Sequence, residues 1–145
     1  MDIFTTFDIA ASGLRAQTTR LNTISSNLAN AETTSTPEGG PYKKKSVVFR
    51  TEPLPFQQHL AASVQDQRHI QGVKVARIIE DTEPPQLVYD PSHPDAREDG
   101  YVAMPNVSVI KETVDMMSAT RSYEANTTTI KSAKRMAMKA LDIGR

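Results

Sequence analysis

The chain of 145 residues has no cysteine and no tryptophan, and its aromatic residues are four phenylalanines and four tyrosines. Without thiols it cannot form disulfides, hold an iron–sulfur cluster through cysteine or use a cysteine nucleophile. Its 17 basic residues balance 17 acidic ones, so no net charge attracts nucleic acid or an anionic membrane. No apolar run approaches the roughly 18 residues that a transmembrane helix needs. We therefore expect no nucleic-acid partner and no membrane insertion.

The first residues also lack the features of a secretion signal. They carry no positively charged region and no apolar stretch of signal-peptide length. We therefore expect that, if the protein leaves the cytoplasm, it does so without a cleaved signal peptide.

The sequence contains no pattern typical of a catalytic site. No serine lies in a nucleophile elbow, and no glycine-rich phosphate loop is present. His59 and His69 have no motif that joins them to an acid or a nucleophile. We predict that the protein is not an enzyme, with no catalytic residues, no cofactor and no small-molecule substrate.

One segment, residues 90–99, gathers potential metal ligands. His93 lies among four carboxylates, those of Asp90, Asp95, Glu98 and Asp99. Prolines at positions 91 and 94 stand where a calcium loop would need ligands or its turn glycine. Prolines in such a stretch favour a rigid extended turn. We interpret the segment as a structural loop and predict no metal site, with a metal-binding protein as an alternative reading.

A seven-residue apolar rhythm marks the N-terminal part of the chain. Its positions step by four and three, and Gln17 is the one polar member: Ile3, Phe7, Ala10, Leu14, Gln17, Leu21, Ile24 and Leu28. Such a seam is typical of a helix face that packs on another helix. It predicts a helix over residues 3–30, which ends where threonine, proline and glycine become frequent. Gly13, inside this helix, marks either a close helix contact or a tolerated surface glycine.

The C-terminal part carries a matching seam. Its positions are Met116, Ala119, Tyr123, Asn126, Ile130, Ala133, Ala137 and Ala140. The seam predicts a second helix, which begins after Asn106 or Ser108 as N-cap and runs to about Asp142. Apolar residues in its first turns lie on a different face from the seam, so we expect the packing partner to change along the helix.

The middle of the chain has a different composition. Strand-like segments occur at 46–49, 72–79, 87–89 and 101–103, and seven of the nine prolines fall between Pro53 and Pro105. A short helical turn around 56–64 is a further candidate, and the lysines at 43–45 are expected to form a solvated strand edge. We predict an α+β fold in which long terminal helices form a coiled-coil-like pair around a small β-rich unit. The expected parts are an N-terminal axial helix (1–35), the β-rich unit with long loops (36–105) and a C-terminal axial helix (106–145).

Several motifs resemble those of one protein family. The segments Ser12–Gln17 and Ser26–Ala31 resemble the N-terminal signature of the bacterial flagellar axial proteins, and Arg121–Asn126 resembles their C-terminal motif. The stretches Thr36–Lys45, Gly72–Ala76 and Asp90–Ala96 are similar to those of the proximal rod subunits within that group. The positions that carry the resemblance are Ser12, Gly13, Asn27, Asn30, Asp90, His93 and Asp95.

The resemblance implies a structural subunit of the flagellar proximal rod in the basal body, within the periplasmic space. Such a subunit assembles helically with itself and other rod proteins through both seams, forming the drive shaft that carries motor torque to the hook. It also implies export by the flagellar type III apparatus. Asn27, Asn30 and Asn126 are then either buried amides that fix helix register or residues at solvent and helix ends. A cytoplasmic helical adaptor, which would fold its terminal helices without a polymer, is the other alternative.

Overall fold

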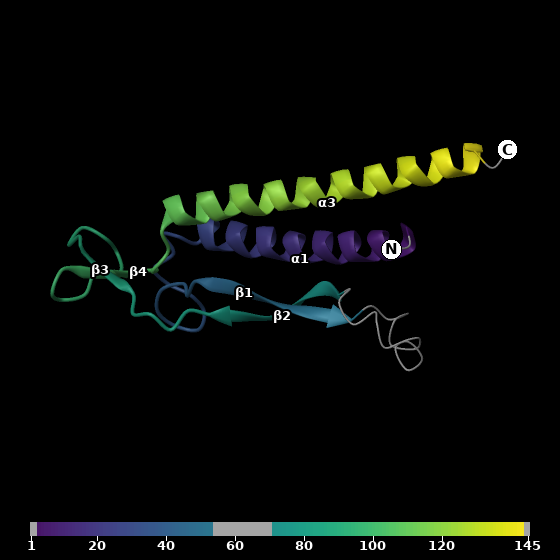
Figure 1. The fold of residues 1–145 in the computed structure, drawn as a ribbon. Helices are drawn as coiled ribbons and strands as arrows, with labels where there is room; N and C mark the ends of the chain where they lie inside the picture. Colours follow the sequence, from purple (N-terminus) through teal and green to yellow (C-terminus); the bar gives the residue numbers. More distant parts are fainter. Residues whose placement is uncertain (1–2, 54–70, 144–145) are drawn as a thin grey trace.

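The computed structural model describes residues 3–53 and 71–143. Its elements are α1 (Ile3–Ala29), β1 (Lys45–Pro53), β2 (Gln71–Glu80), β3 (Gln86–Tyr89), β4 (Tyr101–Met104) and α3 (Val109–Ile143) (Figure 1). Two long terminal helices therefore flank small antiparallel strands, which confirms the predicted α+β class. The helical turn predicted at 56–64 lies outside the described residues.

Helix α1 is the central layer of the molecule. It runs antiparallel beside α3 on one side, and the β1–β2 hairpin covers its other side (Figure 1). Because two elements cover it, α1 has buried residues all along its length: Ala10, Ser12, Gly13, Ala16, Thr23, Ile24 and Asn27. Helix α3 is covered on the side of α1, and its outer face stays open to solvent.

Strands β1 and β2 form an antiparallel hairpin that is tied to α1. Lys45 pairs with Glu80 at one end and Pro53 with Gln71 at the other, with a register shift between Val48 and Phe49. The hydroxyl of Ser12 in α1 accepts a hydrogen bond from the Val73 amide of β2 (3.1 Å). This bond fixes the position of the hairpin along the axis of α1.

Strands β3 and β4 form a separate two-stranded sheet. It lies beyond the end of the helix pair, opposite to the end at which α3 finishes (Figure 1). Tyr89 and Tyr101 pair across the sheet, with their ring centroids 5.2 Å apart in an edge-on arrangement. Gly100 has a φ of 74°, and a Cβ there would lie 2.8 Å from the Tyr89 ring, so glycine is required at this turn.

The start of α3 shows which of the two candidate caps is used. The Ser108 hydroxyl accepts a hydrogen bond from the Lys111 amide (3.4 Å), and the Ser108 carbonyl accepts one from the Glu112 amide (2.9 Å). Ser108 is therefore the N-cap. The other candidate, Asn106, uses its side chain to bond Gln86 and Glu83 instead. Within residues 3–53 and 71–143, no helix has the length and apolarity needed to cross a membrane.

Candidate assembly interface

A buried amide joins three elements of the fold. Asn27 is 1% exposed, near the C-terminal end of α1. Its Nδ2 donates to the Lys45 carbonyl (2.8 Å) and to Glu112 Oε2 (3.0 Å). Its Oδ1 accepts from the Lys45 amide (2.9 Å) and from the Tyr42 hydroxyl (3.0 Å). All donors and acceptors of this amide are used, so the side chain fixes α1, the start of β1 and the start of α3 relative to one another.

The carboxylate that Asn27 contacts is itself buried and paired. Glu112 is 2% exposed, and its Oε1 accepts from Lys44 Nζ at 2.8 Å. The Lys44 side chain is 15% exposed. The expectation that all three lysines at 43–45 form a solvated edge is therefore wrong for Lys44. Its ammonium has turned inward because an unpaired buried carboxylate would be far more costly than an ion pair.

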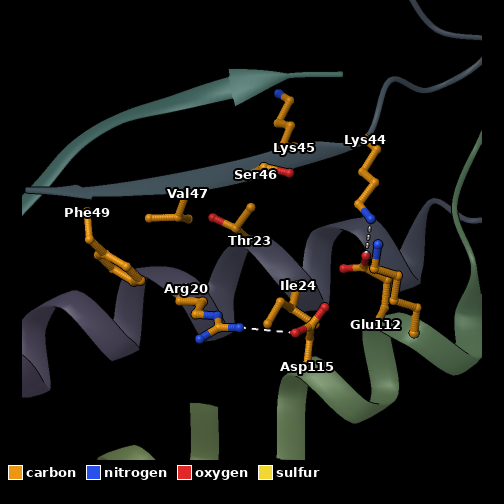
Figure 2. A pocket seen from close by; sticks show the side chains of 11 residues that line it. Arg20, Thr23, Ile24, Lys44, Lys45, Ser46, Val47, Phe49, Glu112 and Asp115 are labelled. Carbon is orange, nitrogen blue, oxygen red and sulfur yellow. Dashed lines mark hydrogen bonds and ion pairs between the residues drawn. The ribbon is translucent and has the colours of Figure 1, made fainter. Parts of the chain in front are cut away.

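Beside this network lies a cavity of about 430 Å³ between α1, β1 and α3. Figure 2 shows Lys44 directed at Glu112 and, farther along α1, Arg20 directed at Asp115. Arg20 Nη2 lies 3.1 Å from Asp115 Oδ1, an ion pair that joins the two terminal helices directly. Most of the charged side chains that line the cavity thus form ion pairs with residues of other elements. They form no arrangement of a nucleophile with a base.

Farther along the helix pair, small residues bring the two backbones close together. Ala119 and Ala133 of α3 are 0% and 1% exposed, and Ala10 and Ala16 of α1 are both 3% exposed. Gly13 is buried here as well, and a Cβ on it would lie 2.8 Å from Asn126 Nδ2. Of the two readings of Gly13, the structure therefore shows the close helix contact.

We expect Gly13→Ala alone to change the free energy of unfolding by less than about 1 kcal/mol. Alanine gains about 1 kcal/mol of helix propensity, but it must displace the Asn126 amide. In an Asn126→Ala background the same substitution has room, and it should then stabilise the chain by about 1 kcal/mol. Thermal unfolding of the four proteins checks this, and equal effects of Gly13→Ala in both backgrounds would contradict the close contact.

The structure brings the two predicted seams together within one chain. Along the N-terminal seam Ala10 and Ile24 are buried, and the remaining members are half-buried: Ile3, Phe7, Leu14, Gln17, Leu21 and Leu28. Along the C-terminal seam Ala119 and Ala133 are buried, and Met116, Asn126, Ile130 and Ala137 are half-buried. Tyr123, at 39% exposed, and Ala140 lie open to solvent. Both seams thus keep accessible surface after the helices of one chain have packed.

The three asparagines have different environments. Asn27 is the buried amide of the network described above. Asn30 lies at the end of α1, where its Nδ2 donates to the Ser26 carbonyl (2.9 Å) and its Oδ1 accepts from the Thr33 hydroxyl (3.2 Å). Asn126 is half-buried against Gly13. Of the two alternatives predicted for these asparagines, Asn27 is therefore a buried amide, and Asn30 is a residue at a helix end.

The loop with His93 is a series of hydrogen-bonded turns. Asp90 Oδ1 accepts from the amide (3.0 Å) and the hydroxyl (2.6 Å) of Ser92, which holds the pKa of this carboxyl below its usual range. His93 Nδ1 accepts from the Asp95 amide (3.1 Å), and Asp95 Oδ2 accepts from the Thr34 hydroxyl (2.6 Å). Among the described residues, no group of three or more acidic or histidine side chains is placed to hold a metal ion.

Sequence reasoning missed the residues that the network depends on most. A glutamate near the start of a helix normally faces solvent, so nothing in the pattern around Glu112 indicated burial. Lysine side chains also normally face solvent, so nothing in the run of three lysines indicated that Lys44 is largely buried. The one available signal was Asn27, which stands among the positions of the family resemblance.

Comparisons with known proteins agree in pointing to one family. The family model described as "Flagella basal body rod protein" matches residues 7–35, and the model described as "Flagellar basal body rod FlgEFG protein C-terminal" matches residues 98–143. The chain is 45% identical over 144 residues to the flagellar basal-body rod protein FlgC of Salmonella typhimurium, covering 99% of each chain. It is 43% identical over 150 residues to the FlgC of Bacillus subtilis, covering 100% of both. The FlgC of Borreliella burgdorferi is 42% identical over 149 residues, which covers 99% of this chain and 98% of that protein.

Proposed function

This chain belongs to the family of flagellar basal-body rod proteins, and from this premise we propose that it builds the proximal rod by packing its terminal helices against those of neighbouring subunits. It is a structural subunit of the flagellar rod. Its assembly partners are other rod components.

The one-sided cover of α3 is the observation that carries the proposal. Apolar side chains along its first three turns are open to solvent: Val109 (50% exposed), Ile110 (79%), Val114 (61%) and Met117 (53%). Ile110, Val114 and Met117 follow one another at helical spacing, so they lie on one face. An apolar stripe of this kind on a rod subunit is suited to a helix of a neighbouring subunit.

The buried network gives each subunit the stiffness that a drive shaft needs. Asn27, Glu112 and Lys44 hold the two terminal helices and β1 in one arrangement. Subunits that do not deform internally pass torque on through their mutual contacts. We propose that many such contacts, each of modest strength, together transmit the torque of the motor to the hook.

We further propose that the flagellar type III apparatus exports the chain, without cleavage of a signal peptide, to the part of the basal body in the periplasmic space. Membership of the rod family supports this route. Its relatives are named as rod proteins, and we propose no catalytic role. No observation in the described residues or the comparisons favours a cytoplasmic adaptor or a metal-binding protein.

Deleting the gene from the source bacterium tests the function. The deletion strain should lose swimming and should yield no complete hook–basal bodies, because a missing rod subunit interrupts the shaft. A plasmid copy of the gene should restore both. Normal swimming in the deletion strain would contradict the proposed function.

A further inference from the structure

The two ends of the molecule carry opposite charges. Helix α3 finishes at one end, and the β3–β4 sheet with its connecting loop lies at the other (Figure 1). We call residues 131–142 of α3 the basic tail, and β3, β4 and residues 90–100 between them the acidic hairpin. The tail has four basic side chains and one acidic one, and the hairpin has four acidic side chains and one basic one, Arg97.

The basic tail runs past its packing partner. Gly13 faces Asn126 and Asn27 contacts Glu112, so in this antiparallel pair Ile3 comes opposite the helix near Met136. Beyond that point the described part of α1 offers no cover. Three apolar side chains of the tail are exposed: Met136 (61%) at this point, and Met138 (55%) and Leu141 (70%) beyond it. Its cations Lys131, Lys134, Arg135 and Lys139 are exposed too, and none is paired with a carboxylate of a described residue.

The acidic hairpin has the complementary chemistry. Leu87, Tyr89 and Tyr101 lie on one face of its sheet, because strand residues alternate and Tyr89 pairs with Tyr101. They are 57%, 65% and 42% exposed. The carboxylates of Glu98 and Asp99 are exposed in the loop that joins the two tyrosines. The Ser92 amide and hydroxyl donate to Asp90 in the same loop, which favours the ionised form of this carboxyl.

We propose that the basic tail of one copy docks on the acidic hairpin of a second copy of this chain. The pairing places lysine and arginine against carboxylates, and methionine and leucine against tyrosine faces, which also attract cations. The two surfaces lie at opposite ends of a helix pair that is about 50 Å long, so one copy cannot join its own ends. Each copy then uses its tail on one neighbour and its hairpin on another. A contact of this heterologous type either closes into a ring or propagates into an open helical array, and the open array is the form that fits a rod.

This proposal rests on the proposed function, because it concerns a subunit that assembles with itself. It deepens that function by assigning two surfaces to one contact between like subunits.

The absence of cysteine allows a direct test by cross-linking. Two full-length proteins, Leu87→Cys and Met138→Cys, are purified and treated with a short bismaleimide, separately and as a mixture. The mixture should give a cross-linked dimer, and each protein alone should give about tenfold less. A chain with both substitutions should give a ladder of oligomers. A double-cysteine product that stops at the dimer, or no product at all, would overturn the head-to-tail arrangement.

Charge reversal tests the chemistry of the contact. Glu98→Lys with Asp99→Lys in the hairpin protein should lower the yield with the unchanged tail protein by about tenfold, through lost attraction and new repulsion. Lys134→Glu with Arg135→Glu in the tail protein should restore the yield with the reversed hairpin. Lys43→Glu with Arg121→Glu, exposed positions elsewhere, is the matched control and should leave the yield within about twofold. Failure of the double reversal to restore the product would overturn the proposed charge pairing.

The same double-cysteine chain, treated in isolated basal bodies, separates this proposal from the proposed function. A head-to-tail product between copies of the chain supports the docking. The chain at its normal amount without that product, or with a product to another rod protein only, overturns the docking and leaves the rod function intact. Absence of the chain from particles that are otherwise complete would count against the rod function itself.

Discussion

Replacing Asn27 with aspartate is expected to lower the free energy of unfolding by about 3–5 kcal/mol. The substitution keeps the shape of the side chain and changes the donor Nδ2 into an oxygen. That atom lies 3.0 Å from Glu112 Oε2 and 2.8 Å from the Lys45 carbonyl, so two hydrogen bonds become contacts between acceptors. A second carboxylate also enters a buried site in which Lys44 Nζ pairs with Glu112 at 2.8 Å. Urea unfolding followed by circular dichroism measures the loss.

Asn22→Asp is the matched control for this substitution. Asn22 lies on the same helix and is exposed, so its conversion should change the free energy of unfolding by less than about 0.5 kcal/mol. The Asn27→Asp variant should also regain stability as the pH falls from 7 to 5. A proton taken up by the introduced aspartate in the folded state restores a donor toward Glu112, and uptake of a proton by the folded state stabilises it as the pH falls. Similar stability losses for the two variants would contradict the role assigned to the buried network.

Leu21→Asp and Ile130→Asp are each expected to abolish rod assembly and swimming. Both residues belong to the seams and stay half-buried in the single chain, so each keeps surface for a neighbouring subunit. A carboxylate there would have to be desolvated when subunits pack, and this cost recurs in every copy of the rod. Swimming, and the amount of the variant in purified basal bodies, measure the effect.

Leu21→Met and Ile130→Val are the controls, because they keep an apolar side chain at the same positions. Both should support swimming. Circular dichroism of the purified aspartate variants should show that the β1–β2 hairpin keeps its strand signal. If either aspartate variant assembled normally, the assignment of the seams to assembly would be wrong.

The terminal helices could be predicted because their apolar positions repeat along the chain. The helix predicted over 3–30 is observed at Ile3–Ala29, and the strands predicted at 46–49 and 72–79 lie within β1 and β2. Ser108 could be named as one of two caps because serine satisfies free amides at a helix start. Helices, strands and caps depend on residues that are close together in the chain, so their patterns can be recognised in the sequence.

The buried network could not be predicted, because it depends on residues far apart in the chain. Asn27 and Glu112 are 85 positions apart, and their contact follows only from the antiparallel packing of α1 on α3. The pattern likewise did not show that β3–β4 forms a sheet of its own beyond the helix pair. The sequence did indicate part of the open face of α3. Ile110, Val114 and Met117 lie on a different face from the C-terminal seam.

The most direct test of the rod function is quantitative mass spectrometry of hook–basal bodies purified from the source bacterium. Peptides of this chain should be present in amounts comparable to those of other rod subunits. The particles should be lost when the gene is deleted. Complete basal bodies that lack the chain would contradict the assignment of this protein to the rod.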